Sequence, residues 1–229
     1  MPRWRRKRLI DFCCKAGGTS MGYHMAGYDV VGVDREPQPN YPFAFYQDDI
    51  EYIDDRQIAN IRRDYDAVAA SVPCQAYSIT QTLSNGKHPM LIEYARWLLT
   101  EIDLPFVMEN VPGAPLRNPV QVCGSALGLR VQRHRLFESN CDIRGTPCMH
   151  GWQNRDRRYV QVPNGPGSKR RTGIAYVYGR GDGTFFNGMK QVDIWRHAMG
   201  IDWMDTAELA QAIPPLYTFH IGKQLSEYT

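Results

Sequence analysis

The chain has 229 residues, of which 43% are hydrophobic and 22% are charged, and its formal net charge at pH 7 is +3. These values are ordinary for a soluble globular protein with one sizeable core. No apolar run approaches the ~20 residues of a membrane span, and none long enough for a signal peptide follows the basic start, so we expect a cytoplasmic protein without a membrane partner. The 6 cysteines are scattered and are interpreted as reduced thiols.

The first half of the chain alternates between predicted strands and helices. A turn with Gly17 and Gly18 and a helix to about Ala26 follow the first strand, and residues 91–102 carry apolar residues at helical spacing. Four short apolar runs are predicted to be buried strands: residues 8–14, 28–34, 66–72 and 105–108. The alternation predicts an α/β fold with a mostly parallel sheet.

The composition changes after Ser139, where Gly, Arg, Asn and Pro become frequent. Short β-like runs are predicted at 159–162 and 174–178, and helices at 194–199 and 206–212, the last with Thr206 as its cap. We therefore expect three parts, an α/β domain, a small irregular β-rich lobe inserted in it, and a returning C-terminal segment, which cover residues 1–139, 140–195 and 196–229.

Basic residues gather in two stretches. One is the start of the chain, and the other runs from Arg130 to Arg171, where only Glu138, Asp142 and Asp156 oppose the arginines and lysines. Such clusters suit a polyanion, because each neutralised phosphate releases condensed counterions. A solvated basic surface explains them equally well.

The glycine turn after the first strand and Asp34 at the end of the second form a pattern that binds adenosine-containing cofactors. Glycines let the backbone approach the ligand, and a carboxylate accepts hydrogen bonds from ribose hydroxyls. A glycine turn is as often only a tight connection, so the pattern decides nothing by itself.

Cys74 follows the third strand directly, in the run Pro73-Cys74-Gln75-Ala76-Tyr77-Ser78. Ligands bind at the carboxyl ends of strands in open α/β sheets, so a nucleophile is useful at this position. A thiolate adds to an electron-poor ring carbon and also leaves readily. A buried structural cysteine is the alternative, and it is favoured when Cys74 is considered alone.

Two further motifs carry ionisable side chains. Glu109, in Glu109-Asn110-Val111 at the end of the fourth strand, would lie beside Cys74 and could protonate a ring nitrogen as the thiolate adds. Arg133 and Arg135 are separated by one residue, so they would point the same way on an extended strand and could hold a base carbonyl oxygen and a phosphate. Solvated Glu and Arg side chains are the alternative for each motif.

The order and spacing of these motifs resemble those of the DNA (cytosine-5) methyltransferase family. The resemblance covers nearly the whole chain, up to Ala210-Gln211-Ala212-Ile213-Pro214-Pro215, which is similar to the family's last motif, usually Gly-Asn-(Ser/Ala)-Val-Pro. The separation of the Pro-Cys and Glu-Asn-Val pairs is its most specific part. The compact form looks like enzymes of bacteriophages or their bacterial hosts.

The resemblance implies a Rossmann-like methyltransferase that acts as a monomer on double-stranded DNA, with S-adenosylmethionine as the cofactor. Cys74 would add to C6 of a flipped cytosine, Glu109 would hold N3 and the exocyclic amine, and Arg133, with Arg135 beside it, would contact O2. C5 would then take the methyl group, lose its proton and release Cys74. The implied cofactor-binding residues are Asp11, Cys13, Ala16, Gly17, Gly18, Asp34, Arg35, Asp49, Ile50, Pro73, Gln211 and Ala212.

Several positions depart from the family's pattern. Lys15 occupies the first glycine of the cofactor turn, and Cys13 stands where an aromatic residue usually packs on the adenine. Asp34 stands where the family usually has a glutamate. Val131 stands where the Gln of Gln-x-Arg-x-Arg is expected, and Gln211 replaces the Asn of the last motif. Lys15 could meet a carboxylate of S-adenosylmethionine or of a carboxylated analogue; the alternative is a lysine that points to solvent.

The resemblance makes residues 140–195 the target-recognition lobe, which is short for the family. The residues expected to contact DNA are Gln75, Ser78, Arg135, Arg155, Arg157, Arg158, Lys169, Arg170 and Arg171. Cys141, Cys148 and His150 show no fourth metal ligand, so we expect no metal site. Two other functions stay open: an RNA (transfer RNA) cytosine methyltransferase with the same residues, and a catalytically silent DNA-binding relative.

Overall fold

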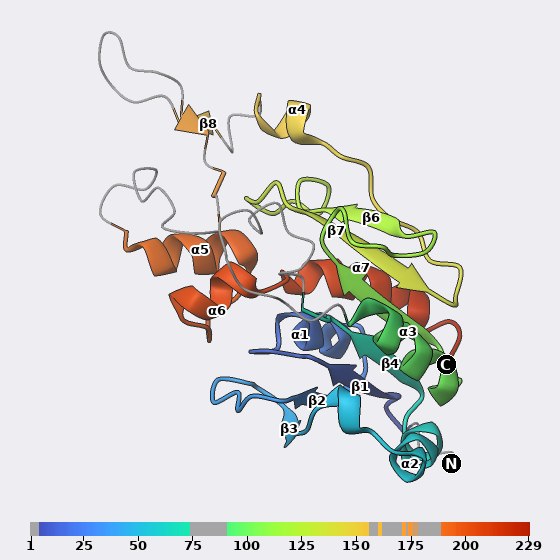
Figure 1. The fold of residues 1–229 in the computed structure, drawn as a ribbon. Helices are drawn as coiled ribbons and strands as arrows, with labels where there is room; N and C mark the ends of the chain where they lie inside the picture. Colours follow the sequence, from blue (N-terminus) through green and yellow to red (C-terminus); the bar gives the residue numbers. More distant parts are fainter. Residues whose placement is uncertain are drawn as a thin grey trace, which may run out of the picture.

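The structure is a computed structural model, and it describes residues 5–73, 91–155, 160–161, 171–172, 174–175, 177 and 189–229. Its centre is a seven-stranded sheet with the order β3-β2-β1-β4-β5-β7-β6 (Figure 1). The strands are β1 (Arg8–Phe12), β2 (Asp29–Asp34), β3 (Ala44–Gln47), β4 (Ala67–Ala70), β5 (Phe106–Asn110), β6 (Val120–Cys123) and β7 (His134–Ser139). The strands β1 to β5 are parallel to one another, and β7 runs antiparallel to both β5 and β6. The predicted fold class, a mostly parallel α/β sheet, is confirmed.

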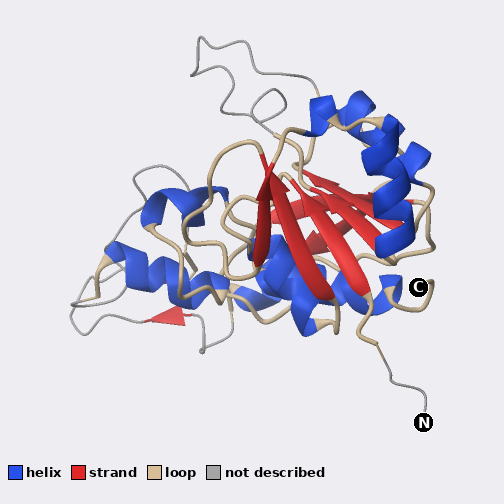
Figure 2. Ribbon diagram, turned by 90° about the horizontal axis from the view of Figure 1, so that it is seen from below, coloured by secondary structure: helices blue, strands red, loops and turns tan. Residues whose placement is uncertain are grey.

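Helices cover both faces of the sheet (Figure 2), and the strand residues alternate between the two faces. Leu9 of β1 packs with the core beneath α1 (Gly18–Met25) and α7 (Pro215–Leu225), whereas Ile10 packs with the core beneath α2 (Asp55–Asp64) and α3 (Ile92–Ile102). Because both faces are covered, the strands are near-continuous apolar runs, and such runs can be predicted from the sequence. Three further α-helices lie in the described part: α4 (His150–Gln153), α5 (Gln191–Met199) and α6 (Thr206–Gln211).

The helices α1 and α7 are in close contact, although they are almost 200 residues apart in the chain (Figure 1). A Cβ atom on Gly22 would lie 2.0 Å from Thr218 Oγ1 and 2.1 Å from the carbonyl oxygen of Pro215. The Thr218 hydroxyl donates a hydrogen bond to the carbonyl of Thr19 at 2.8 Å. The backbones therefore approach more closely than any side chain at position 22 would allow.

Two local predictions were wrong. The cap of α6 is Asp205 and not Thr206, because the Asp205 carboxylate accepts the amide of Glu208 while Glu208 accepts the amide of Asp205, a complete capping box. Residues 174, 175 and 177 form no strand; the short strand β9 (Arg171–Thr172) lies before them and pairs with β8 (Val160–Gln161). The strands β3 and β6 and the helices α2 and α7 were not predicted from the sequence.

None of the helices in the described ranges is long and apolar enough to cross a membrane.

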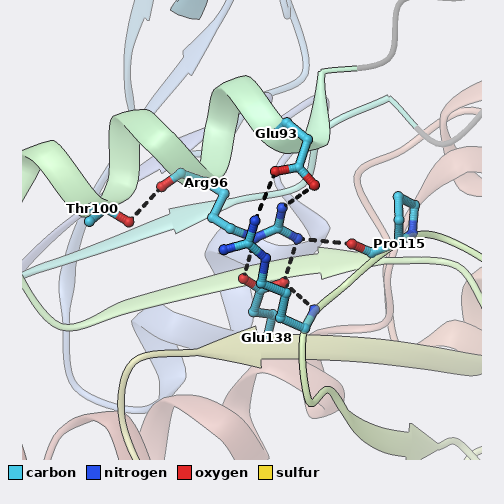
Figure 3. Close-up of polar contacts among 6 residues, drawn as sticks. Glu93, Arg96, Thr100, Pro115 and Glu138 are labelled. Carbon is cyan, nitrogen blue, oxygen red and sulfur yellow. Dashed lines mark hydrogen bonds and ion pairs between the residues drawn. The ribbon is translucent and has the colours of Figure 1, made fainter.

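A buried ion pair joins α3 to β7 (Figure 3). Arg96 Nε donates to Glu138 Oε1 at 2.7 Å. Arg96 Nη2 donates to Glu138 Oε2 and to the carbonyl of Pro115, each at 2.9 Å. Glu138 Oε2 also accepts the backbone amide of Arg117. Both charged residues are only 5% exposed, so a charged partner is required for either to be buried.

Substituting Glu138→Gln should destabilise the fold strongly, because it leaves the buried Arg96 guanidinium with only the exposed Glu93 as a countercharge, 2.6 Å from Arg96 Nη1. We expect the free energy of unfolding to fall by about 3–5 kcal/mol, measured by urea denaturation followed by circular dichroism. The control is Arg63→Ala, which breaks the exposed pair of Arg63 with Asp64 and should leave the urea midpoint unchanged. Equal midpoints for the two variants would show that the buried pair does not stabilise the fold.

Candidate active site

The carboxyl ends of β1, β2, β4 and β5 meet at one edge of the sheet, because these strands are parallel. The predicted cofactor turn follows β1, and Asp34 is the last residue of β2. Pro73 follows β4, and Glu109 is the second-to-last residue of β5. The structure therefore brings these predicted site residues together at this edge. Cys74, Gln75 and Ser78 lie outside the described residues.

The turn after β1 alternates into the left-handed region three times, at Cys13 (φ 54°), Lys15 (φ 47°) and Gly17 (φ 83°). Only Gly17 is a glycine, and a side chain at such a position costs about 1–2 kcal/mol. This explains why the family pattern has a glycine at the position of Lys15. Burial raises the pKa of the Cys13 thiol to about 12, and the Asp34 carboxylate adds to this, so Cys13 stays a thiol at neutral pH.

Asp34 is buried and its carboxylate is held in place from both sides. Oδ2 accepts the backbone amide of Lys15 and Oδ1 that of Glu36, each at 3.1 Å. Lys15 Nζ lies 3.8 Å from Asp34 Oδ1 and 3.5 Å from Glu36 Oε2. The half-exposed lysine thus bends back over the acidic end of β2 and is already near two carboxylates, which weakens the reason to expect a carboxylated ligand there.

The predicted last motif lies on the cofactor turn. A Cβ atom on Gly18 would lie 2.4 Å from the carbonyl oxygen of Ile213, so this glycine permits the close approach. Ala212 is buried beside it, and Trp203 Nε1 donates to the carbonyl of Ala16 at 2.8 Å. Next to this contact is a cavity of about 200 Å³, lined by Lys15, Ala16, Glu36, Pro37, Gln38, Pro39, Glu208 and Gln211.

Asp11 is fully buried beneath the first turn of α1. Its Oδ2 accepts the hydroxyls of Thr19 at 2.8 Å and Ser20 at 2.6 Å, so the carboxyl positions the start of the helix. The other oxygen, Oδ1, has no hydrogen-bond partner among the described residues. Burial raises the pKa of Asp11 to about 6, against the two hydroxyls, which lower it.

Glu109 is 7% exposed and lies among charged groups. Arg135 Nε is 3.1 Å from Glu109 Oε1. Burial raises the pKa of Glu109, and Asp11 raises it further, while Arg135 and then Arg133 lower it. The net effect is a pKa above the ordinary value for a glutamate, which is the direction of shift that a proton donor needs.

The two arginines have different surroundings. Arg135 pairs with Glu109, whereas Arg133 donates to the carbonyl oxygens of Ala212 at 3.2 Å and Ala210 at 3.5 Å in the last motif. The hydroxyl of Tyr217 in α7 donates to the carbonyl of Arg133 at 2.7 Å. The arginine beside the carboxyl is therefore Arg135, and Arg133 links the start of β7 to the C-terminal segment.

Asn110 has a role that the sequence reasoning missed. Its Nδ2 donates to the carbonyl of Val72 at 3.1 Å, and its Oδ1 accepts the amide of Val111. This fixes the end of β5 to the segment that enters Pro73 and Cys74. The Glu-Asn-Val motif contained the signal, because an asparagine at a strand end often bonds to neighbouring backbone.

The remaining predicted residues are more scattered. Asp49 accepts the amide of Glu51 and begins a short 3-10 turn, Ile50 is buried in it, and Arg35 is exposed at the end of β2. Arg155 is exposed and donates to the carbonyl of Gly151. Arg171 belongs to β9, while Arg157, Arg158, Lys169 and Arg170 lie outside the described residues.

Sequence comparison relates the first half of the chain to a known family. A model of the C-5 cytosine-specific DNA methylase family matches residues 7–119. The type II methyltransferase M.XorII of Xanthomonas oryzae pv. oryzae is 32% identical over 118 residues, which are 45% of this chain and 28% of that protein. The chain spans between 28% and 49% of the length of the curated relatives it matches.

Two solved structures are similar over nearly the whole chain. The Entamoeba histolytica methyltransferase EhMeth has a TM-score of 0.62 at 11% identity and covers 97% of this chain and 98% of its own. The S. pombe Dnmt2 methyltransferase has a TM-score of 0.57 at 10% identity, with 97% and 99% covered. At these identities the likeness establishes a shared fold.

The raised pKa of Asp11 predicts a pH-dependent stability. Because the folded pKa of about 6 exceeds the ordinary 3.8, the stability that the Asp11 proton contributes is full below pH 3.8 and is lost as the pH rises through 6. We therefore expect the wild type to lose about 2–2.5 kcal/mol relative to Asp11→Asn between pH 4 and pH 7.5, measured by urea denaturation. Asp202→Asn, at an exposed aspartate, should follow the wild-type profile. A constant difference between wild type and Asp11→Asn would contradict the assignment.

Proposed function

Because residues 7–119 match the C-5 cytosine-specific DNA methylase family, we propose that the chain transfers a methyl group from S-adenosylmethionine to C5 of cytosine in double-stranded DNA. The observation that carries this proposal is the buried Glu109 with a raised pKa, paired with Arg135, at the sheet edge where the chain leads into Pro73 and Cys74. A buried proton donor beside a cysteine nucleophile is what addition to a pyrimidine ring requires.

The described residues fit the cofactor. The Asp34 carboxylate is oriented by two backbone amides, which leaves lone pairs for ribose hydroxyls. The helix α1 begins after Gly17 without a side-chain cap, so its first amides suit the anionic carboxylate of a methionine group. When bound, S-adenosylmethionine would supply the methyl group on an electrophilic sulfonium.

Each residue of the proposed centre has one task. The Cys74 thiolate forms a bond to C6 of a flipped cytosine while Glu109 gives its proton to N3, so electron density gathers at C5. Once C5 carries the methyl group and has lost its proton, the bond from C6 to sulfur breaks, N3 gives its proton back to Glu109, and the thiolate returns. Flipping costs a few kcal/mol and is needed because C6 is inaccessible in a stacked duplex.

The geometry supports Arg135, and not Arg133, as the residue that contacts O2 of the base. O2 is bonded to C2, the ring atom next to N3. A group that holds O2 must therefore lie beside the group that holds N3. Arg135 lies 3.1 Å from Glu109, whereas Arg133 is bound to the last motif. Arg133 then positions residues 210–213 over the cofactor turn.

The test is nucleoside analysis by mass spectrometry of DNA and transfer RNA from a host without cytosine methylation that expresses the protein. We expect 5-methylcytosine in DNA with the wild type, none with Cys74→Ala, and at least about 100-fold less with Glu109→Gln, because general acid catalysis is removed. Cys141→Ser, a cysteine outside the centre, should retain the activity.

Other outcomes discriminate the alternatives. 5-Methylcytosine in transfer RNA alone would support an RNA methyltransferase, and a heavier modified cytosine would indicate a carboxylated cofactor. Unmodified nucleic acid with every variant would overturn the proposal and favour a silent DNA-binding relative.

Cofactor binding can be measured separately by calorimetric titration with S-adenosylmethionine. Asp34→Asn should weaken binding at least tenfold, since a charge-assisted hydrogen bond to the ribose is worth about 1.5–3 kcal/mol. The matched control is Asp29→Asn, at the exposed opposite end of β2, which should bind as the wild type does. Equal affinity of all three proteins would remove Asp34 from the cofactor site.

A further inference from the structure

Two cysteines and two histidines meet at the far edge of the sheet and have no part in the proposed reaction. Cys123 is the last residue of β6 and His134 the first of β7, and these two are register partners across the hairpin. Cys148 lies in the segment that leads into α4, and His150 is the first residue of that helix; Figure 1 shows α4 above β6. The four ligand atoms all lie within 4.8 Å of one another.

The distances are close to those of a tetrahedral metal site. Cys123 Sγ lies 3.1 Å from His150 Nε2, and Cys148 Sγ lies 3.5 Å from His134 Nε2. Zinc bonds of about 2.0–2.3 Å at tetrahedral angles place neighbouring ligand atoms roughly 3.3–3.8 Å apart. The widest separation in the cluster therefore has to shorten by only about 1 Å, which rotations of exposed side chains such as Cys148 provide.

The surroundings of the cluster hold the ligands in place. The amide of Cys123 donates to Thr146 Oγ1 at 2.9 Å, and its sulfur is 3.0 Å from Ser125 Oγ, which also accepts the amide of Met149. Cys123 is fully buried, while Cys148 is exposed. The site is thus fixed on its inner side and open to a metal ion from solvent.

The donor set selects the metal. Two thiolates and two imidazoles, with no carboxylate, suit zinc and not calcium or magnesium, which take oxygen ligands. Four protein ligands leave no open position for water or substrate, as in structural zinc sites.

We propose that Cys123, His134, Cys148 and His150 bind one zinc ion as a structural site. The ion would join the β6–β7 hairpin, which carries Arg133 and Arg135 on either side of His134, to the segment that leads into α4 and the expected recognition lobe. This goes beyond the methyltransferase function and does not depend on it.

The proposal departs from the sequence expectation, which combined Cys141 with Cys148 and His150 and found no fourth ligand. Cys141 follows the opposite end of β7, and its sulfur contacts Asn140 at 3.5 Å. The two missing ligands come from strands that are paired only in the folded protein.

The test measures metal content by inductively coupled plasma mass spectrometry on the full chain, purified without a histidine tag under reducing conditions. We expect about one zinc per chain in the wild type and at least a tenfold loss in Cys148→Ser/His150→Gln. The matched control, Cys141→Ser/His197→Gln, changes a cysteine and an exposed histidine outside the cluster and should keep its zinc.

A second measurement uses the wild type alone, so it does not depend on how the variants fold. Cobalt added to the reduced, zinc-free protein should give the intense visible bands of tetrahedral cobalt and a sulfur-to-cobalt charge-transfer band, and equimolar zinc should remove both. Failure of the reduced wild type to take up zinc or cobalt would overturn the proposal. So would loss of zinc from the control, or a Cys123–Cys148 disulfide that re-forms in place of metal uptake.

Discussion

The close packing of α7 on α1 is the contact on which the geometry of the candidate site depends. Gly22 has no room for a Cβ atom, since Thr218 and Pro215 lie about 2 Å from where it would be. This contact fixes the start of α7, and the residues just before it then lie on Gly18 and accept hydrogen bonds from Arg133. The last segment of the chain thus completes a turn formed by its first strand. A binding site assembled from both ends of the sequence exists only when the whole domain is folded.

Buried charge is the second constraint, and it is arranged unevenly. Asp11 and Glu109 lie on the same face of the sheet, are both buried, and each carries a raised pKa. Arg135 and Arg133 offset only part of the cost of burying Glu109. Asp11 instead has two hydroxyl donors, which hold α1. The fold therefore uses one of these carboxyls to position a helix and leaves the other beside two arginines, and the role proposed for Glu109 as a proton donor rests on that difference.

The sequence predicted the features that local pattern determines. The parallel strands were found because buried apolar runs are distinctive, whereas α2 was missed because Ile58 and Ile61 are the only residues it buries, although the capping box of Asp54 and Gln57 marks its start. The different roles of Arg133 and Arg135 depend on where the C-terminal segment returns, and the meeting of Cys123 with His134 depends on the register of β6 and β7. Neither is encoded within a short window of sequence, so neither could be predicted from it.

The strand β7 connects these features through its alternation. Phe137 packs in the core beneath α1 and α7, and Arg135, two residues earlier on the same face, reaches Glu109. Glu138 is on the other face, where Arg96 of α3 holds it. His134 begins the strand and lies in the cysteine–histidine cluster. The strand is thus held near its end by a buried ion pair and at its start by the hairpin and the cluster, with Arg135 between them. An arginine on a strand restrained at both ends loses little conformational freedom when it meets a substrate, and such preorganisation is what a site that binds a flipped base requires.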